Sequence, residues 1–184
     1  MRKFDSTLWD LLKSATTLKM KQRVEIICRV LDGLIYVQNK GVVHLDIKPA
    51  NIMVDKNANG EWDGKTVIIV DFGLSTTFDC LKGNAGTPGF GSPEQFLGKP
   101  SYKSDNYGLG KTGIITIFPW QSAWNFLAQP VEDGEISEVE NSPLLKPFHG
   151  MISALLSVSI FTLRVWHYEH LQALVGTTIY HPIF

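Results

Sequence analysis

The fold is decided by one polar stretch, His44-Leu45-Asp46-Ile47-Lys48-Pro49-Ala50-Asn51. Before it, apolar residues recur at helical spacing from Met20 to Lys40, which predicts an amphipathic helix that ends at Gly41. After it, β-type runs over residues 51–54 and 66–70 predict two strands, joined by a long polar turn over residues 55–65. The stretch is therefore expected on a loop between a long helix and a β-hairpin.

Further elements are expected on both sides of this unit. Leu8, Leu11 and Leu12 predict a shorter helix, with Ser6 or Thr7 as its cap. Glycines and prolines interrupt residues 83–100, which predicts an irregular segment at the surface. Residues 105–118 and 151–175 are expected to form helices, and the acidic residues 131–140 an exposed connection between them.

Two groups of side chains can carry chemistry. In the polar stretch, Asp46, Lys48 and Asn51 offer a carboxylate, an amine and a carboxamide. Phosphoryl transfer needs a carboxylate to orient an attacking hydroxyl and accept its proton, a cation near the transferred phosphate, and oxygen ligands for magnesium. The second group, Asp71-Phe72-Gly73, follows the second strand, where a carboxylate before a Gly turn is well placed to hold a metal on phosphates. Either group alone is a weak signal, because capped turns and chance occurrences produce both.

The order of four motifs makes the signal specific. The chain continues with Gly86-Thr87-Pro88-Gly89-Phe90-Gly91-Ser92-Pro93-Glu94 and then Ser104-Asp105-Asn106-Tyr107-Gly108-Leu109-Gly110. In this order the motifs resemble the catalytic loop, the magnesium-binding motif, the end of the activation segment and the next buried helix of eukaryotic-type protein kinases. The resemblance is strong over residues 8–110 and weak after 118. It implies an α+β, protein kinase-like fold in which residues 1–184 form part of the domain, a mainly helical C-terminal lobe with short β-hairpins.

The resemblance implies a role for each matching residue. Asp46 would be the catalytic base, Lys48 would stabilise the transferring phosphate, and Thr87 would bond to both. Asn51 and Asp71 would be the magnesium ligands and, with Lys48, would bind ATP. Lys48 together with Gly86-Thr87 resembles the serine/threonine type rather than the tyrosine type. Structural roles are implied for the remaining matches: His44, Phe72, Gly73, Asp105, which would tie the catalytic loop to the following helix, and Glu94, buried against Arg164.

The sequence departs from the family pattern in several places. Leu45 stands where many members have an Arg that receives a phosphate on the activation segment, so phosphorylation of Ser75, Thr76 or Thr77 has no obvious local partner. Ser92 stands where the family usually has Ala. No Gly-rich loop, Val-Ala-Ile-Lys strand or Glu-bearing helix precedes Ser6, so the N-terminal lobe that holds ATP is expected to be missing.

Composition limits the class of protein. The 184 residues allow one core, and a net charge of −1 gives no reason to bind nucleic acid or an anionic membrane. Cys28 and Cys80 form no pattern typical of a disulfide framework or a zinc site. The N-terminus lacks a secretory signal, and the apolar run 151–163 is shorter than the roughly 20 residues of a spanning helix. An intracellular, cytoplasmic protein is expected.

Two other binding patterns are discounted. Gly108-Leu109-Gly110-Lys111-Thr112 resembles the end of a phosphate-binding loop, but Asp105 stands where that loop needs its first Gly. The stretch Asp55–Gly60 resembles the opening of a calcium loop, but position twelve is Thr66 rather than Glu. A buried helix and a polar turn, respectively, are the favoured interpretations.

Two functions remain open from the sequence. The first is a protein kinase that transfers the γ-phosphoryl of ATP, with Mg²⁺, to Ser or Thr hydroxyls of a protein substrate, present here as a fragment inactive alone. The second is a pseudokinase or truncated remnant that acts as a protein-binding module. The intact catalytic-loop residues favour the first function, and the missing ATP-anchoring Lys favours the second. The surface that would meet the missing lobe is expected to be apolar and prone to self-association.

Overall fold

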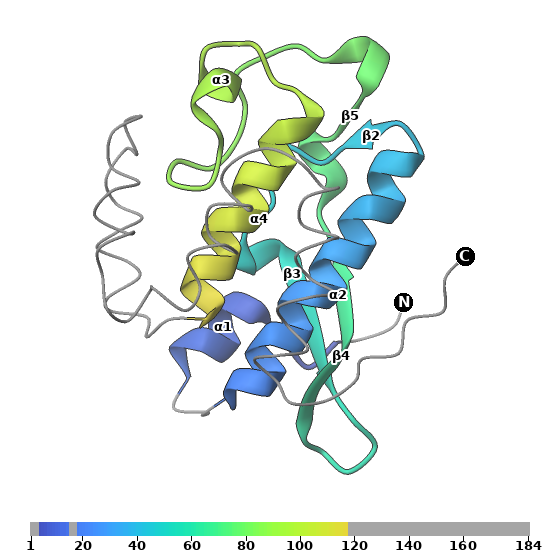
Figure 1. The fold of residues 1–184 in the computed structure, drawn as a ribbon, viewed down its shortest axis with the longest axis vertical. Helices are drawn as coiled ribbons and strands as arrows, with labels where there is room; N and C mark the ends of the chain where they lie inside the picture. Colours follow the sequence, from blue (N-terminus) through green and yellow to red (C-terminus); the bar gives the residue numbers. More distant parts are fainter. Residues whose placement is uncertain (1–3, 15–17, 118–184) are drawn as a thin grey trace.

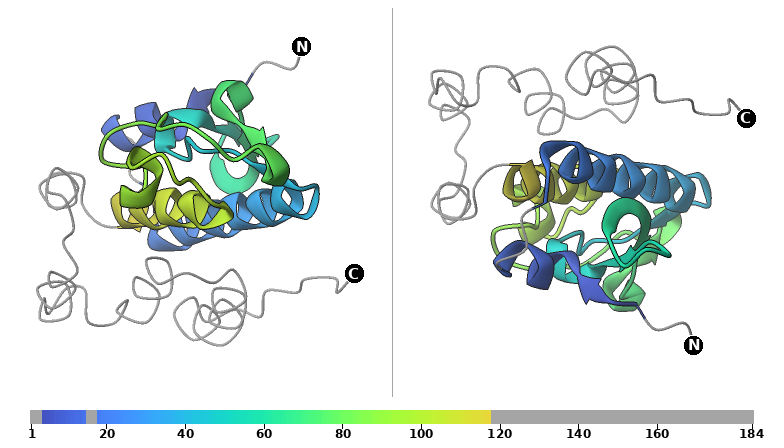
Figure 2. Two further views of the ribbon diagram at one scale, coloured as in Figure 1. Left: turned by 90° about the horizontal axis from the view of Figure 1, so that it is seen from above. Right: turned by 90° about the horizontal axis from the view of Figure 1, so that it is seen from below.

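The computed structural model describes residues 4–14 and 18–117 (Figure 1). The helices are α1 (Leu8–Lys13), α2 (Met20–Asn39), α3 (Pro93–Phe96) and α4 (Tyr102–Ile117). The strands are β1 (Ser6–Thr7), β2 (Val42–Val43), β3 (Ile52–Lys56), β4 (Trp62–Ile69) and β5 (Thr76–Thr77). Short 3₁₀ turns cover Pro49–Asn51, Phe72–Leu74 and Phe78–Cys80. The views in Figure 2 show that α2 and α4 lie side by side, with the strands and α1 against them.

The long helix α2 was predicted correctly, because its apolar spacing is that of a helix with one buried stripe. It ends at Asn39, and Gly41 follows shortly after. Its buried stripe packs against β4 and α4. The core contains buried residues from the helices, the hairpin, the loop after β2 and the segments before α2 and α3: Leu8, Leu11, Leu18, Ile26, Ile27, Val30, Leu31, Leu34, Ile47, Ile52, Val54, Phe90, Leu109, Ile114, Ile115 and Ile117.

Strands β3 and β4 form the predicted antiparallel hairpin, but its turn is shorter than expected. The register pairs Ile52 with Ile69, and pairing resumes beyond an irregularity where Lys56 meets Trp62. The turn closes tightly because the Asn57 side chain accepts the backbone N–H groups of residues 59 and 61. Pairing therefore extends into the predicted turn at both ends.

The first residues combine a strand with a helix cap. Ser6 and Thr7 pair with Val54 and Met53, so β1 extends the hairpin to three strands in the order β1-β3-β4. Thr7 then caps α1, because its Oγ1 accepts the backbone N–H of Asp10 at 3.0 Å. The predicted cap is present, and the strand is an addition that the sequence pattern did not indicate.

A second small sheet was also not predicted. Strand β2 pairs with β5, with Val42 opposite Thr77 and Val43 opposite Thr76. This sheet joins the chain just after α2 to the segment that follows Asp71-Phe72-Gly73. The pairing brings both predicted functional stretches to one region, because β2 leads directly into His44.

Two helix predictions need correction. The short helix α3 lies inside residues 83–100, which were expected to be irregular throughout. Helix α4 begins at Tyr102 rather than at residue 105, because Ser101 Oγ accepts the backbone N–H of Lys103 at 3.1 Å and so caps an earlier start. Gly108–Thr112 lies inside α4, which agrees with the rejection of a phosphate-binding loop. The predictions for residues 131–140 and 151–175 lie outside the described residues.

None of the described helices combines enough length with enough apolar character to span a membrane.

Candidate active site

We call residues 44–51, which resemble the catalytic loop of protein kinases, the catalytic loop; helix α4 holds this loop in place. Asp105, only 1% exposed, accepts the backbone N–H of His44 through Oδ2 at 2.7 Å and that of Leu45 through Oδ1 at 2.6 Å. Gly108, on the next turn of α4, lies so close to the loop that an added Cβ would be 2.8 Å from the carbonyl oxygen of Ile47. Helix α4 thus supports the loop by two hydrogen bonds and by direct backbone packing.

Burial raises the pKa of Asp105 to about 6, although hydrogen bonds from His44, Leu45 and Gln38 act in the opposite direction. The carboxyl group is removed from water, which disfavours its charged form. The bonds from two backbone N–H groups favour the charged form, but they do not fully offset burial. The geometry of the catalytic loop is therefore coupled to a group that titrates in mildly acidic solution.

Asp46, Lys48 and Thr87 form a closed set of contacts. Lys48 Nζ donates to Asp46 Oδ2 at 2.7 Å and to Thr87 Oγ1 at 2.6 Å, and Thr87 Oγ1 donates to Asp46 Oδ1 at 2.6 Å. Each of the two carboxylate oxygens is thus engaged. Lys48 remains partly exposed, with 21% of its side chain accessible. The amine is therefore held beside the Asp46 carboxylate by a side chain that is partly open to solvent.

The environment of Asp46 keeps its carboxylate charged. Burial alone would raise its pKa, but hydrogen bonds from Lys48, Thr87 and Asn51, with the charge of Lys48, bring the pKa below its ordinary value. A charged carboxylate with fixed orientation can accept a hydrogen bond from an incoming hydroxyl.

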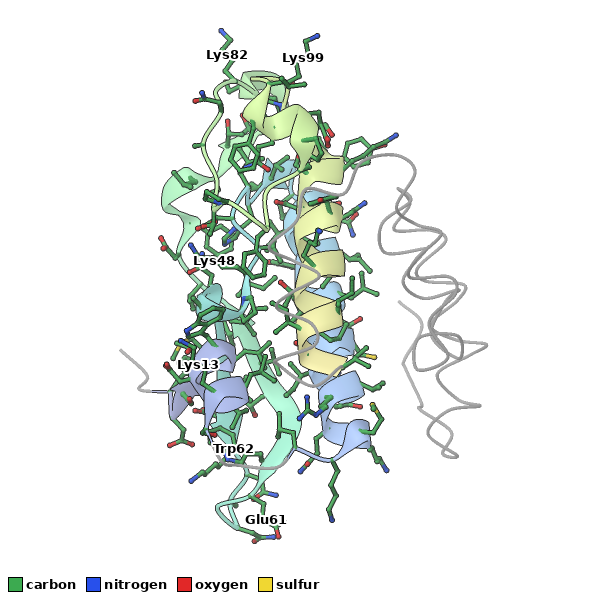
Figure 3. The ribbon with its side chains drawn as sticks, turned by 90° about the vertical axis from the view of Figure 1, so that its left-hand side faces the viewer. Lys13, Lys48, Glu61, Trp62, Lys82 and Lys99 are labelled. Carbon is green, nitrogen blue, oxygen red and sulfur yellow. The ribbon has the colours of Figure 1, made fainter. Side chains whose placement is uncertain are left out.

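Figure 3 shows Lys48 partway along the molecule, between Lys82 toward one end and Glu61 at the other.

Asn51 links the loop to the hairpin. Its Nδ2 donates to the carbonyl oxygen and to Oδ2 of Asp46, both at 3.0 Å. Its backbone carbonyl accepts the N–H of Val70 at 2.9 Å, which brings Asp71 beside it. Among the described residues no hydrogen bond uses Asn51 Oδ1. The oxygen that could bind a cation is therefore free of competing contacts.

His44 connects the loop with the end of β4. Its Nδ1 accepts the backbone N–H of Asp46 at 3.2 Å, which assigns the ring proton to Nε2, 3.0 Å from the carbonyl oxygen of Val70. Burial lowers the pKa of His44, so the ring is neutral near pH 7. The ring of Phe72 meets it edge-on, with the centroids 4.7 Å apart. His44 and Phe72 thus contact each other and orient groups that flank the loop.

Asp71 is exposed and has a left-handed backbone, with φ of 64°. Its Oδ1 accepts the backbone N–H of Gly73 at 3.4 Å, and this contact begins the 3₁₀ turn Phe72–Leu74. The carboxylate is accessible to solvent and stands next to Asn51 through the Val70 contact. Asp71 directly follows Val70, whose N–H bonds to the Asn51 carbonyl oxygen, so these two oxygen-bearing side chains belong to neighbouring stretches of the chain.

These donors fit a magnesium ion that is completed by phosphate oxygens and water. Magnesium takes oxygen ligands and is often held by one or two protein side chains together with substrate phosphates. Among residues 4–14 and 18–117, no group of three or more His, Cys, Asp or Glu side chains could hold a metal alone. Asn51 and Asp71 each offer an oxygen atom of the type that such a site uses.

Glu94 and Arg164 were expected to form a buried pair. Glu94 is half-buried in α3, and Arg164 lies outside the described residues. The pair therefore stays a prediction.

Gln95 is a functional candidate that the sequence analysis missed. It is 1% exposed, and its Nε2 donates to the carbonyl oxygens of Leu45, at 2.8 Å, and of Ala85. A polar residue next to Glu94 in a region rich in Gly and Pro gives no sign of such burial. Only the packing of α3 against the catalytic loop reveals it.

The comparison with known families agrees with this geometry. The family model described as "Protein kinase domain" matches residues 2–126. The chain therefore belongs to the protein kinase family. The expected superfamily, serine/threonine type, and the kinase-like α+β fold are confirmed.

Similar curated proteins are named as serine/threonine kinases. The chain is 38% identical over 122 residues to Serine/threonine-protein kinase PknA of a Nostoc species, which covers 60% of this chain and 20% of the relative. It is 32% identical over 133 residues to Serine/threonine-protein kinase C of a Synechocystis species, covering 67% and 23%. It is 27% identical over 142 residues to pkn2 of Myxococcus xanthus, covering 70% and 17%. The chain thus spans about a fifth of the length of these relatives.

Proposed function

We propose that residues 1–184 contain the catalytic, mainly helical lobe of a protein kinase that transfers the γ-phosphoryl of ATP to Ser or Thr hydroxyls of a protein. The observation that carries this proposal is the contact set in which Thr87 Oγ1 bonds to both Asp46 and Lys48. It fixes a charged carboxylate and an amine on one side of a loop. Phosphoryl transfer depends mainly on such positioning and on electrostatic stabilisation.

In this proposal Asp46 accepts a hydrogen bond from the substrate hydroxyl and then takes its proton. Its charged state at neutral pH suits the first of these steps, because only an ionised carboxylate is purely an acceptor. Lys48 places positive charge beside the transferring phosphoryl. Thr87 keeps both groups oriented but does not itself take the proton.

Asn51 and Asp71 would hold the metal, for which we propose Mg²⁺. When bound, the ion neutralises charge on the phosphates of ATP. Asn51 offers Oδ1, and its amide nitrogen holds it against Asp46. Asp71 offers an exposed carboxylate. Loss of either oxygen should therefore weaken binding of the metal–nucleotide complex.

Transfer needs groups that the 184-residue sequence does not contain. The Gly-rich loop and the Val-Ala-Ile-Lys strand of the family position the phosphates, and neither pattern occurs in this chain. We therefore expect the chain alone to be inactive. An active chimera would join it to an N-terminal kinase lobe that carries both patterns.

The chimera provides the test of the proposal. Transfer of labelled γ-phosphate to a protein mixture should require Mg²⁺ and should fall by at least about a thousandfold in Asp46→Asn, with ATP binding retained. Asp71→Asn should lose transfer and also bind Mg–ATP more weakly. Asp79→Asn is the matched control, because Asp79 is an exposed carboxylate in the same segment and should leave transfer unchanged. Full transfer by Asp46→Asn would overturn the assignment.

A second candidate function is that of a protein-binding module. It is favoured by exposed apolar side chains around the Asp71-Phe72-Gly73 motif: Ile68, Phe72, Leu74 and Phe78, each exposed by 40–43%. Such a surface can bind another protein or a second copy of the chain. Concentration-dependent sedimentation of the chain, abolished by Phe72→Ser with Leu74→Ser, would support this function if the chimera also failed to bind ATP.

A further inference from the structure

Gln95 bridges two segments that lie far apart in the sequence. From α3, its amide nitrogen donates to the carbonyl oxygen of Leu45, in the catalytic loop, and to that of Ala85, in the segment before Thr87. The side chain is 1% exposed, so neither bond competes with water. We call this pair of hydrogen bonds the Gln95 bridge.

The space around the bridge is closely fitted to the amide. Gly86 follows Ala85 with φ of +147°, a conformation that side chains rarely allow. An added Cβ there would overlap Gln95 Nε2. The Gln95 backbone N–H in turn bonds to the carbonyl oxygen of Ser92 at 3.1 Å, which fixes the start of α3. The amide is therefore closely surrounded by the chain around Gly86.

Both carbonyl groups of the bridge adjoin residues of the proposed site. Leu45 directly precedes Asp46, and Ala85 lies two positions before Thr87. The Thr87 hydroxyl bonds to Asp46 at 2.6 Å, so the bridge and this contact join the same two segments in parallel. Loosening the bridge should therefore let Thr87 and Asp46 move apart.

The Gln95 bridge stands in for a contact that this chain cannot make, the bond between a phosphate and the Arg that many family members have at the position of Leu45. At position 45, a buried Leu that is 5% exposed has no charge with which to bind a phosphate. A carboxamide that donates to two carbonyl oxygens is neutral, and its strength does not depend on phosphorylation. The two segments are thus joined by contacts that are present in the unmodified chain.

From this geometry we propose that Gln95 is a positioning residue that holds residues 83–91 against the catalytic loop without phosphorylation. The effect on catalysis rests on the proposed kinase function. The effect on the order of residues 83–91 does not, because it follows from the hydrogen bonds alone.

Hydrogen–deuterium exchange of the phosphatase-treated, full 184-residue chain tests the proposal. Gln95→Met keeps the length of the side chain but replaces the amide with an apolar group that has no donor, so exchange in residues 83–91 should rise by about tenfold or more. Gln22→Met is the matched control, because Gln22 also donates its amide to a backbone carbonyl, that of Trp62, toward the opposite end of the molecule from Lys82 and Lys99 (Figure 3). It should leave residues 83–91 unchanged.

A second variant keeps the test decisive if Gln95→Met fails to fold. Gly86→Ala adds a methyl group where the amide lies, so it should raise exchange over the same residues while the helix α2 stays protected. Unchanged exchange of residues 83–91 in both variants, with α2 protected, would overturn the proposal. Wild-type exchange that is already as fast as in unfolded chain would overturn it too.

The chimera adds a catalytic readout. With phosphatase-treated protein, Gln95→Met should lower kcat by about tenfold and leave the KM for ATP nearly unchanged, because the bridge orients Asp46 and does not contact the proposed metal ligands. Unchanged kcat in an active chimera would overturn the positioning role. An inactive wild-type chimera would overturn the proposed function, whereas the exchange data would still decide whether the bridge orders the segment.

Discussion

The carboxylate of Asp105 accepts the backbone N–H of Leu45 at 2.6 Å. Leu45 has φ of 66°, a left-handed conformation that costs a residue other than Gly about 1 kcal/mol or more. Two hydrogen bonds compensate for this cost: the Leu45 N–H donates to Asp105, and the Leu45 carbonyl oxygen accepts from Gln95. The orientation of Asp46 therefore depends on side chains that α3 and α4 contribute.

The raised pKa of Asp105 predicts a pH dependence of folding. Its pKa is about 6 in the folded chain and 3.8 in the unfolded chain, so the folded state binds the proton more tightly. The contribution of Asp105 to the free energy of unfolding is fully present below pH 3.8 and is lost as pH rises through about 6. The total loss is about 3 kcal/mol. Urea unfolding of wild type and Asp105→Asn from pH 3.5 to 7 would measure the difference. Parallel curves for the two proteins would contradict the prediction.

Thr87→Ala should reduce turnover more than nucleotide affinity. The change removes the hydroxyl that joins Asp46 to Lys48, at a cost of about 2 kcal/mol in the barrier, or roughly thirtyfold in kcat. Steady-state kinetics of the chimera would measure this. Thr87→Ser keeps the hydroxyl and should restore most of kcat; a serine variant as slow as the alanine variant would show that the methyl group matters instead.

Removing the hydroxyls after the Asp71-Phe72-Gly73 motif should have little effect. The hydroxyls of Ser75 and Thr76 already bond locally, to the carbonyl oxygens of Phe72 and Cys80, and Thr76 and Thr77 pair with β2. Replacing residues 75–77 with Ala should change turnover of the chimera by less than about tenfold, or roughly 1.4 kcal/mol. A triple variant as inactive as Asp46→Asn would mean that another basic residue, such as Lys82, binds a phosphate there.

The two cysteines should differ strongly in reactivity. Cys28 is buried in α2, and burial raises its pKa far above the usual range, so almost no thiolate forms. Cys80 is exposed. Iodoacetamide at pH 8 should label Cys80 at least about a hundredfold faster than Cys28 in the native chain, as read by peptide mass spectrometry. Cys80→Ser is the control that assigns the labelled site. Equal labelling rates of the two cysteines in the native protein would contradict the burial of Cys28 in α2.

The sequence predicted the elements whose signals are local and repeated. Helix α2 has a long periodic pattern, the β3–β4 hairpin has two β-type runs around a polar turn, and the catalytic loop is a contiguous motif. The β2–β5 sheet could not be predicted, because two-residue strands carry no periodicity and exist only through a long-range pairing. Gln95 was missed for a related reason. Its burial depends on where α3 packs, and no local sequence pattern indicates the position of α3.

The contacts of Leu45 also have a consequence for the order in which the chain is made. Its N–H and carbonyl groups are bound by side chains 60 and 50 positions further along. When residues 44–51 have just left the ribosome, these two partner side chains have not yet been synthesised. The loop therefore has no defined conformation at that stage. The loop can reach its final shape only after α4 has emerged, so we expect nascent chains that stop before residue 105 to be handled by the cell as unfolded protein.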